Sequence, residues 1–181
     1  MRYFAFLKAI NVGGSHVVTM DRLRAIFTAM GLPGAETFIA SGNVILESKA
    51  RDIRALERKI AGGLEQALGY AVPVFLRSAP EVAAICAYEP FPAKAMAAAT
   101  VVSVGFMAQP LDAEAVTVMK SYNTPDDSFH THGHEFYWMS RTKQSESPFF
   151  RVRFERVFHT EVTLRNLTTV RKLAAKYAID G

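Results

Sequence analysis

The sequence predicts an α+β fold made of two tandem halves that share one order of elements. Apolar residues switch between strand and helix spacing along the 181 residues, and each half runs strand–helix–strand–strand–helix–strand. Turn and helix-start residues also recur, since Gly42 and Gly133, like Met20 and Leu111, stand 91 positions apart. That order is the split-βαβ, or ferredoxin-like, pattern. One repeat at so long a period indicates a duplicated half-domain and not a solenoid.

The first half, residues 1–88, is marked by capping and turn residues. Thr19 is the expected N-cap of a helix that Gly31 ends. Ser41-Gly42-Asn43 supplies turn chemistry between two strands. The expected strands are 2–7, 37–40, 44–46 and 72–76, and the expected helices are 19–30 and one that starts near 52.

The second half, residues 99–181, repeats the order and ends in an additional C-terminal helix without a counterpart in the first half. Its expected strands are 101–106, 129–131, 135–139 and 161–164, and its expected helices are 112–121, one from about 147, and 168–177. Residues 89–92, Glu-Pro-Phe-Pro, are the most linker-like stretch. Because each half is small, we expect a large apolar contact that makes the two halves one compact unit.

Composition excludes several classes of protein. Half of the residues are apolar and 11% are aromatic, which is too much for a disordered chain. No apolar run is long enough to span a membrane, and the apolar run after Arg2 is too short for a signal peptide. A single cysteine, Cys86, cannot form an internal disulfide. We therefore expect a cytoplasmic protein with no membrane partner.

Positive charge is concentrated at the C-terminus. The net charge is +4, and residues 141–181 contain nine basic and four acidic side chains. A basic segment of this kind suits an anionic small molecule or a nucleic acid. An ordinary solvated face is the alternative.

One connection is longer than the scaffold requires. Between first strand and first helix the first half uses residues 8–18, whereas the second half uses only residues 107–110. The long connection contains Asn11-Val12-Gly13-Gly14-Ser15 and leads to a helix N-terminus, where converging backbone amides favour an anion. Neither a Walker loop nor a GxGxxG fingerprint is present. A tight strand–helix turn also needs glycines and is the alternative.

The candidate ligand-binding site combines three segments that are distant in sequence. Its predicted residues are Asn11, Gly13, Gly14, Ser41, Asn43, Arg165 and Asn166. The first strand ends where the third begins, so the loop and the Ser41 turn are expected to be neighbours. Ser41-Gly42-Asn43 is equally well explained as a hairpin turn, and Asn166 or Thr168 as a cap of the last helix.

No residue pattern demands catalysis, a metal or a cofactor. His130 and His132 share a strand face, as two metal ligands would, but surface histidines of a hairpin that also carries His134 are the simpler interpretation. Cys86 lies in an apolar stretch and is expected to be inert. No aromatic stacking platform for RNA is complete in either half. No metal or cofactor is expected, and whether the protein is an enzyme stays open.

Three segments resemble a bacterial family known as domain of unknown function 1697. They are residues 9–14 (AINVGG), residues 37–44 (TFIASGNV) and residues 163–170 (TLRNLTTV). The resemblance implies a bacterial protein of two ferredoxin-like halves whose activity is not established. The family's usual arginine-glycine pair is replaced here by Lys8-Ala9, and lysine lacks the forked donors of arginine.

Three functions therefore compete. The first is a protein that binds a phosphate-bearing small molecule or nucleic acid at the Gly-Gly loop. The second is an enzyme acting on such a ligand, and the third is a protein–protein interaction module in which the motifs are only structural. A bound anion at the loop favours the first two, and an exposed apolar patch favours the third.

Overall fold

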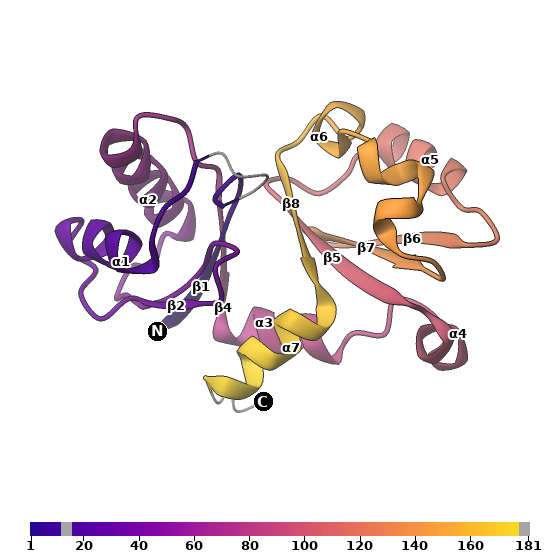
Figure 1. Ribbon diagram of the computed structural model, residues 1–181, viewed down its shortest axis with the longest axis horizontal. Coiled ribbons are helices and arrows are strands. Elements are labelled where there is room, and N and C mark those ends of the chain that lie inside the picture. The colour runs from indigo at the N-terminus through magenta and orange to yellow at the C-terminus, as the bar shows by residue number, and fades with distance from the viewer. Residues whose placement is uncertain (12–15, 178–181) are drawn as a thin grey trace. The chain divides into compact units, whose positions relative to one another are not determined.

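A computed structural model of the chain, which describes residues 1–11 and 16–177, has a mixed α+β fold with two four-stranded antiparallel sheets. The α+β class predicted from the sequence is confirmed. The chain divides into two compact units, unit 1 with residues 1–84 and unit 2 with residues 85–177 (Figure 1).

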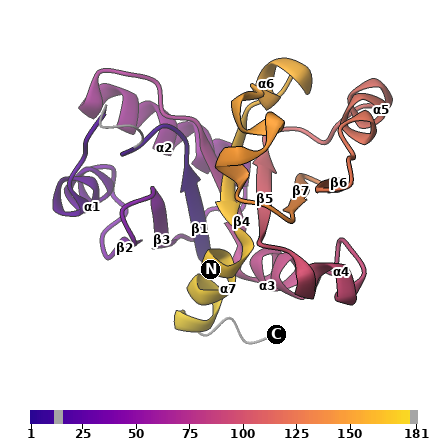
Figure 2. The same cartoon turned by 45° about the vertical axis from the view of Figure 1, so that its right-hand side comes forward.

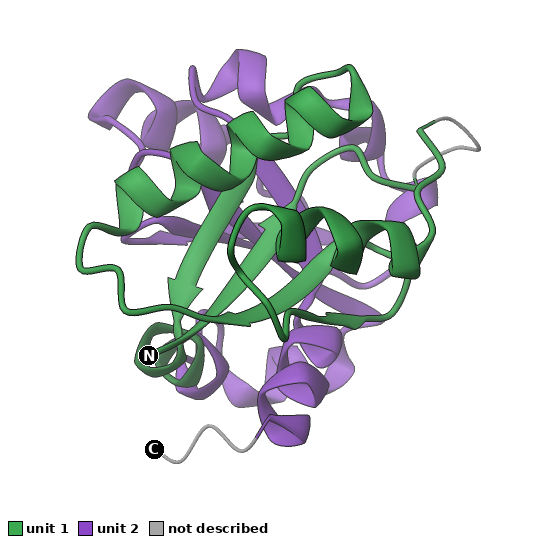
Figure 3. Cartoon of the chain, turned by 90° about the vertical axis from the view of Figure 1, so that its left-hand side faces the viewer, with its two compact units in different colours: residues 1–84, 178–181 green, residues 85–177 purple. Residues whose placement is uncertain are grey.

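Unit 1 has the strand order β2-β3-β1-β4. Two helices lie across one face of this sheet (Figure 3). The elements are β1 (Arg2–Leu7), α1 (Met20–Ala29), β2 (Glu36–Phe38), β3 (Asn43–Glu47), α2 (Ile53–Leu68) and β4 (Val74–Ser78), followed by α3 (Ala79–Ala87), within which the two units divide.

The core of unit 1 lies between its sheet and its helices. Tyr3, Ala5 and Leu7 alternate along β1 and face α1 and α2, where Phe27 and Ile60 are fully buried. Helix α2 carries Gly63 against α1. A Cβ on Gly63 would lie 2.1 Å from the sulfur of Met30, so this glycine allows the two helices to pack closely.

The helix ends of unit 1 agree with the caps predicted at Thr19 and Gly31 and with a second helix that starts near residue 52. Thr19 accepts a hydrogen bond from the backbone N–H of Arg22, and Asp52 accepts one from Ala55. Gly31 adopts a left-handed conformation directly after the last turn of α1, with φ at +77°. These signals are local in sequence, which is why they could be predicted.

Unit 2 has the strand order β6-β7-β5-β8. The helix expected from about residue 147 is absent: two 3₁₀ turns and one short α-helix stand there instead. The elements are α4 (Ala93–Ala98), β5 (Val101–Met107), α5 (Ala113–Ser121), β6 (Asp127–His132), β7 (Glu135–Ser140), η1 (Gln144–Glu146), η2 (Pro148–Arg151), α6 (Phe154–Val157), β8 (Val162–Asn166) and α7 (Leu167–Lys176).

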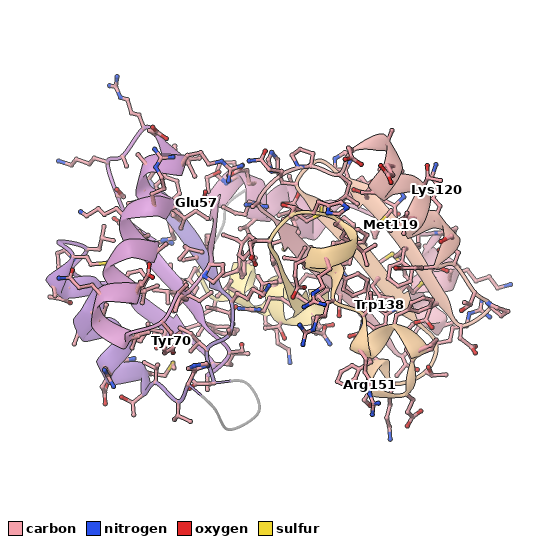
Figure 4. The ribbon with its side chains drawn as sticks, turned by 90° about the horizontal axis from the view of Figure 1, so that it is seen from above. Glu57, Tyr70, Met119, Lys120, Trp138 and Arg151 are labelled. Atoms are coloured by element: carbon pink, nitrogen blue, oxygen red, sulfur yellow. The ribbon has the colours of Figure 1, made fainter. Side chains whose placement is uncertain are left out.

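Proline and aromatic packing explain this difference. Pro148 lacks an N–H and starts η2, for which Ser147 is the cap. Phe154 is then free to reach the ring of Trp138, whose centroid lies 5.9 Å away. Trp138, labelled in Figure 4, is almost fully buried and donates from Nε1 to Asp127, with a distance of 2.6 Å. Packing against the core, and not the spacing of apolar residues, therefore determines the backbone of this segment.

The last helix does have a counterpart, which corrects the prediction that it has none. Helix α7 begins directly after β8 (Figures 1 and 2), and α3 begins directly after β4. Two apolar residues in each helix are buried at the same spacing, Val82 and Ile85 in α3, Val170 and Leu173 in α7. Both sheets are thus followed by a helix of the same kind.

Candidate functional site

The predicted site residues of unit 1 lie where β1 ends and β3 begins. The backbone N–H of Leu7 donates to the carbonyl of Gly42, with a distance of 2.8 Å. The connection that follows β1 and the β2–β3 turn therefore meet at this end of the sheet. We call residues 8–19 and 39–42 together the loop end of unit 1.

Asn11 joins the two connections. Its Nδ2 donates to the carbonyls of Val18 and Ala40, both at 3.0 Å, and its Oδ1 accepts from the N–H of Val18 at 2.7 Å. Both amide protons are therefore used inside the protein. Asn11 acts as a clamp at the base of the loop and does not have a free donor for a ligand.

Asn43 is also a structural residue. It is the first residue of β3, it is almost fully buried, and its Nδ2 donates to the carbonyl of Phe38 at 3.1 Å and to Oγ of Ser41 at 2.8 Å. Of the three residues with turn chemistry, Gly42 adopts the left-handed conformation, with φ at +75°, and Asn43 begins the third strand. Ser41 is exposed at the tip of the turn.

Both connections at the loop end are longer than their equivalents in unit 2. Residues 8–19 separate β1 from α1, and residues 108–112 separate β5 from α5. The β2–β3 turn spans residues 39–42, and the β6–β7 turn is Gly133-His134. Met107 donates to His134 as Leu7 donates to Gly42, so Gly42 matches His134 in the register and not Gly133 as the 91-residue spacing suggested.

Left-handed backbone conformations gather at the loop end. Five described residues other than glycine have a positive φ, and four of them, Ala9, Asn11, His16 and Ile39, lie here. For a β-branched residue such as Ile39, with φ at +52°, this conformation is strongly disfavoured. Strain of this kind persists only where the surroundings hold it, and it is frequent at binding sites.

The electrostatics of the loop end are less favourable to an anion than the sequence suggested. The N-terminus of α1 is capped by Thr19, and Asp21, which pairs with Arg24, adds a negative charge in the first turn. Two large apolar side chains are exposed here, Val17 at 69% and Ile39 at 52%. The ring of His16 lies against that of Tyr70, labelled in Figure 4, with 4.0 Å between centroids and a tilt of 36° between planes.

Gly13 and Gly14 fall outside the described residues, and Arg165 and Asn166 belong to unit 2. Arg165 is in β8 of unit 2, where its Nη1 donates to Oγ1 of Thr163 at 2.9 Å and to the carbonyl of Leu164 at 2.7 Å. Burial lowers the pKa of the Arg165 guanidinium to about 10. The structure thus brings Asn11, Ser41 and Asn43 together within unit 1.

Asn166 is the N-cap of α7, one of the two roles left open. Its side chain accepts from the N–H of Thr168 at 2.8 Å. It also lines a cavity of about 320 Å³ beside α4 and β5, together with Thr100 and Arg171. Hydroxyls and a guanidinium make the cavity polar, but its geometry gives no sign of a particular ligand.

A second arginine in the same position was missed from the sequence. Arg77 lies in β4 opposite Phe4, as Arg165 lies in β8 opposite Val104. Its Nη1 donates to the carbonyl of the preceding residue, Leu76, at 2.8 Å. The signal was available, since both arginines stand one residue before the end of their strands.

The histidines of unit 2 form an aromatic cluster that the sequence did not predict. His130 and His132 share one face of β6, and Tyr88 hydrogen-bonds to the first and stacks on the second. Within residues 1–11 and 16–177, no group of three His, Cys, Asp or Glu side chains is placed to hold a metal ion. Cys86 is half-buried, which raises the pKa of its thiol, although the nearby Arg171 acts in the opposite direction.

Comparison with known proteins gives the family. The model of the family described as a protein of unknown function (DUF1697) matches residues 1–137. The chain belongs to this family. The resemblance predicted from the sequence is confirmed, although its third segment, residues 163–170, lies beyond the matched range.

A solved structure shows the same fold. The conserved bacterial protein SP0830 from Streptococcus pneumoniae aligns with 96% of this chain and 97% of its own length, at 23% identity and a TM-score of 0.77. No curated protein matches the sequence. Among the described helices, none combines the length and the apolar character that crossing a membrane requires.

Proposed function

We propose that the protein binds a phosphate-bearing small molecule or a nucleic acid at the loop end of unit 1. Gly13, Gly14 and Ser41 supply the contacts, and Asn11 and Asn43 hold the two connections in place. We further infer that the units are ferredoxin-like halves related by tandem duplication, and that the protein acts in the bacterial cytoplasm.

One observation carries the binding proposal. The two connections that are lengthened in unit 1 are the two that touch, through the bond from Asn11 to the carbonyl of Ala40. They also contain four of the five left-handed residues other than glycine in the described chain. A scaffold needs neither the added length nor the strain, and function is commonly placed on such loops.

Arg165 and Asn166 take a smaller part in this proposal than the sequence suggested. Asn166 already caps α7, and Arg165 has its equivalent in Arg77. If Arg165 supplies a cation to the ligand, Arg165→Lys must weaken binding more than Arg77→Lys does. Equal weakening assigns both arginines to the scaffold.

Thermal unfolding tests the binding proposal. Inorganic phosphate, a nucleoside triphosphate and a short RNA are added separately, and a ligand present at about 100 times its Kd stabilises the folded state by about 2.7 kcal/mol. Ser41→Ala must reduce this stabilisation, whereas Ser145→Ala, which removes an exposed hydroxyl from η1 of unit 2, must leave it unchanged. Absence of stabilisation by all three probes contradicts the proposal.

A protein–protein interaction module is the second candidate, and the exposed side chains of Val17 and Ile39 favour it. Val17→Ser separates the two candidates. It must leave the response to phosphate probes unchanged if the ligand is held by polar contacts, and it must abolish capture of a protein partner if the apolar surface is the binding element. An enzyme acting on the ligand is tested by looking for product after incubation with each probe that binds.

A further inference from the structure

A cluster of rings in unit 2 holds the segment between α3 and α4 against β6. The hydroxyl of Tyr88 lies 2.7 Å from Nε2 of His130, and the ring of Tyr88 stacks on His132 with 4.3 Å between centroids and 15° between planes. Phe91 adds an edge contact to His130 at 6.3 Å. The stretch that is most linker-like in the sequence is therefore attached by side chains to an edge strand.

The groups that face this cluster come from three elements. On β6, His130 is half-buried and His132 is exposed. On β7, the ring of Tyr137 lies 5.4 Å from that of Tyr88, and the register places Glu135 opposite His132. On the segment itself, Glu89 is exposed. The charge state of His130 is therefore set by burial and by its neighbours on one face of the sheet.

We propose that Tyr88, His130 and His132 form a pH-operated latch, which holds residues 88–91 on β6 at neutral pH and releases them in mild acid. Nε2 of a neutral His130 accepts a hydrogen bond from the hydroxyl of Tyr88. When the imidazole is protonated, Nε2 donates to the phenol oxygen, so the bond itself can persist in the reverse sense. The cost of charging comes from removing the cation from water and from the second imidazole two residues away.

The direction of the effect follows from the burial of His130. Burial, with His132 as the second cause, holds the pKa of His130 below 6.5. Attraction of an imidazolium for the Tyr88 ring acts in the opposite direction but is outweighed. Release of the segment returns the His130 ring to water but leaves His132 two residues away on β6, so burial alone separates the two forms and the latched form binds fewer protons. Latching is therefore complete above pH 6.5 and is lost as the pH falls through the lower pKa of the latched form.

Hydrogen exchange of the full chain measures the latch. The exchange rates of the amides from Ala87 to Phe91, divided by their intrinsic rates at each pH, give the opening constant. From neutral pH into mild acid, this constant must rise about tenfold for each unit by which burial under the segment lowers the pKa of His130. His130→Gln, which stays neutral, must remove the pH dependence. The matched control His159→Asn, at an exposed left-handed position, must retain it.

Two results overturn the latch: an opening constant in the wild type that does not change with pH, or an equal pH dependence in His130→Gln. If His130→Gln does not fold, an NMR titration of the His130 ring in the wild type decides the question. A pKa at or above 6.5 then contradicts the proposal. Tyr88→Phe keeps the ring and removes the hydroxyl, so it must raise the opening constant at neutral pH.

Discussion

The two units share one scaffold and differ in the length of two of its connections. Both sheets have the same strand order, both are followed by a helix, and both carry an arginine at the same place in the last strand. Only unit 1 extends the connections after its first strand and in its hairpin. Features that occur twice belong to the scaffold, and features that occur once are candidates for function.

The same comparison explains how each core is filled. Ala5 in β1 lies opposite Val44, and Gly105 in β5 lies opposite Phe136. A Cβ on Gly105 would stand 2.0 Å from the Phe136 ring, which is fully buried. In unit 2 a smaller strand residue and a larger partner therefore replace Ala5 and Val44 of unit 1.

The largest expected effect tests this exchange. Gly105→Ala must destabilise the protein by about 3 kcal/mol, because Phe136 has no room to move. Gly62→Ala is the matched control, since a Cβ there meets nothing within 4 Å, and it must stabilise by about 0.5 to 1 kcal/mol. Urea denaturation measures both. The double variant Gly105→Ala, Phe136→Val must lose less stability than the two single variants added together. If the losses simply add, the two positions are not coupled.

The second largest expected effect is the loss of stability when Asn11, the clamp of the loop end, is replaced. Asn11→Ala removes three hydrogen bonds and must destabilise by about 2 kcal/mol. Asn11→Asp keeps the acceptor for Val18 but sets a charged oxygen against the carbonyls of Val18 and Ala40, so it must also destabilise the protein. If Asn11→Ala changes the free energy of unfolding by less than about 0.5 kcal/mol, the structural role is contradicted and Asn11 is again a candidate for direct contact with the ligand.

Replacement of Ile39 is expected to stabilise the protein. Asn tolerates a left-handed backbone far better than a β-branched residue, so Ile39→Asn must stabilise by about 1 kcal/mol. A matched change at Val17, Val17→Asn, removes an exposed apolar side chain from a residue whose φ is not positive and must have no such effect. A loss of stability in Ile39→Asn means that the side chain contributes contacts that outweigh the strain.

The smallest expected effect is a difference between the two arginines. Arg77→Lys and Arg165→Lys each lose one guanidinium fork that donates to the preceding carbonyl. Their unfolding free energies must agree within about 0.5 kcal/mol if both arginines serve the scaffold. A larger loss at one position shows that this arginine has taken a role that its counterpart lacks.

Local signals account for most of what the sequence predicted. Thr19 and Asp52 each cap a helix within three residues, so their roles are visible in short stretches. The bonds from Asn11 to Ala40 and from Tyr88 to His130 join residues 29 and 42 positions apart, and no local pattern encodes them. The one false helix, near residue 147, arose because aromatic packing around Trp138 overrides the spacing of apolar residues.

Mapping of bound phosphate by NMR tests the central claim most directly. Backbone amide shifts of the full chain are followed while inorganic phosphate, a nucleoside triphosphate or a short RNA is added. The account predicts that the changes concentrate in residues 8–19 and 39–43. Changes confined to the cavity beside α7, at Thr100 and residues 166–171, or no changes with any of the three probes, would contradict it.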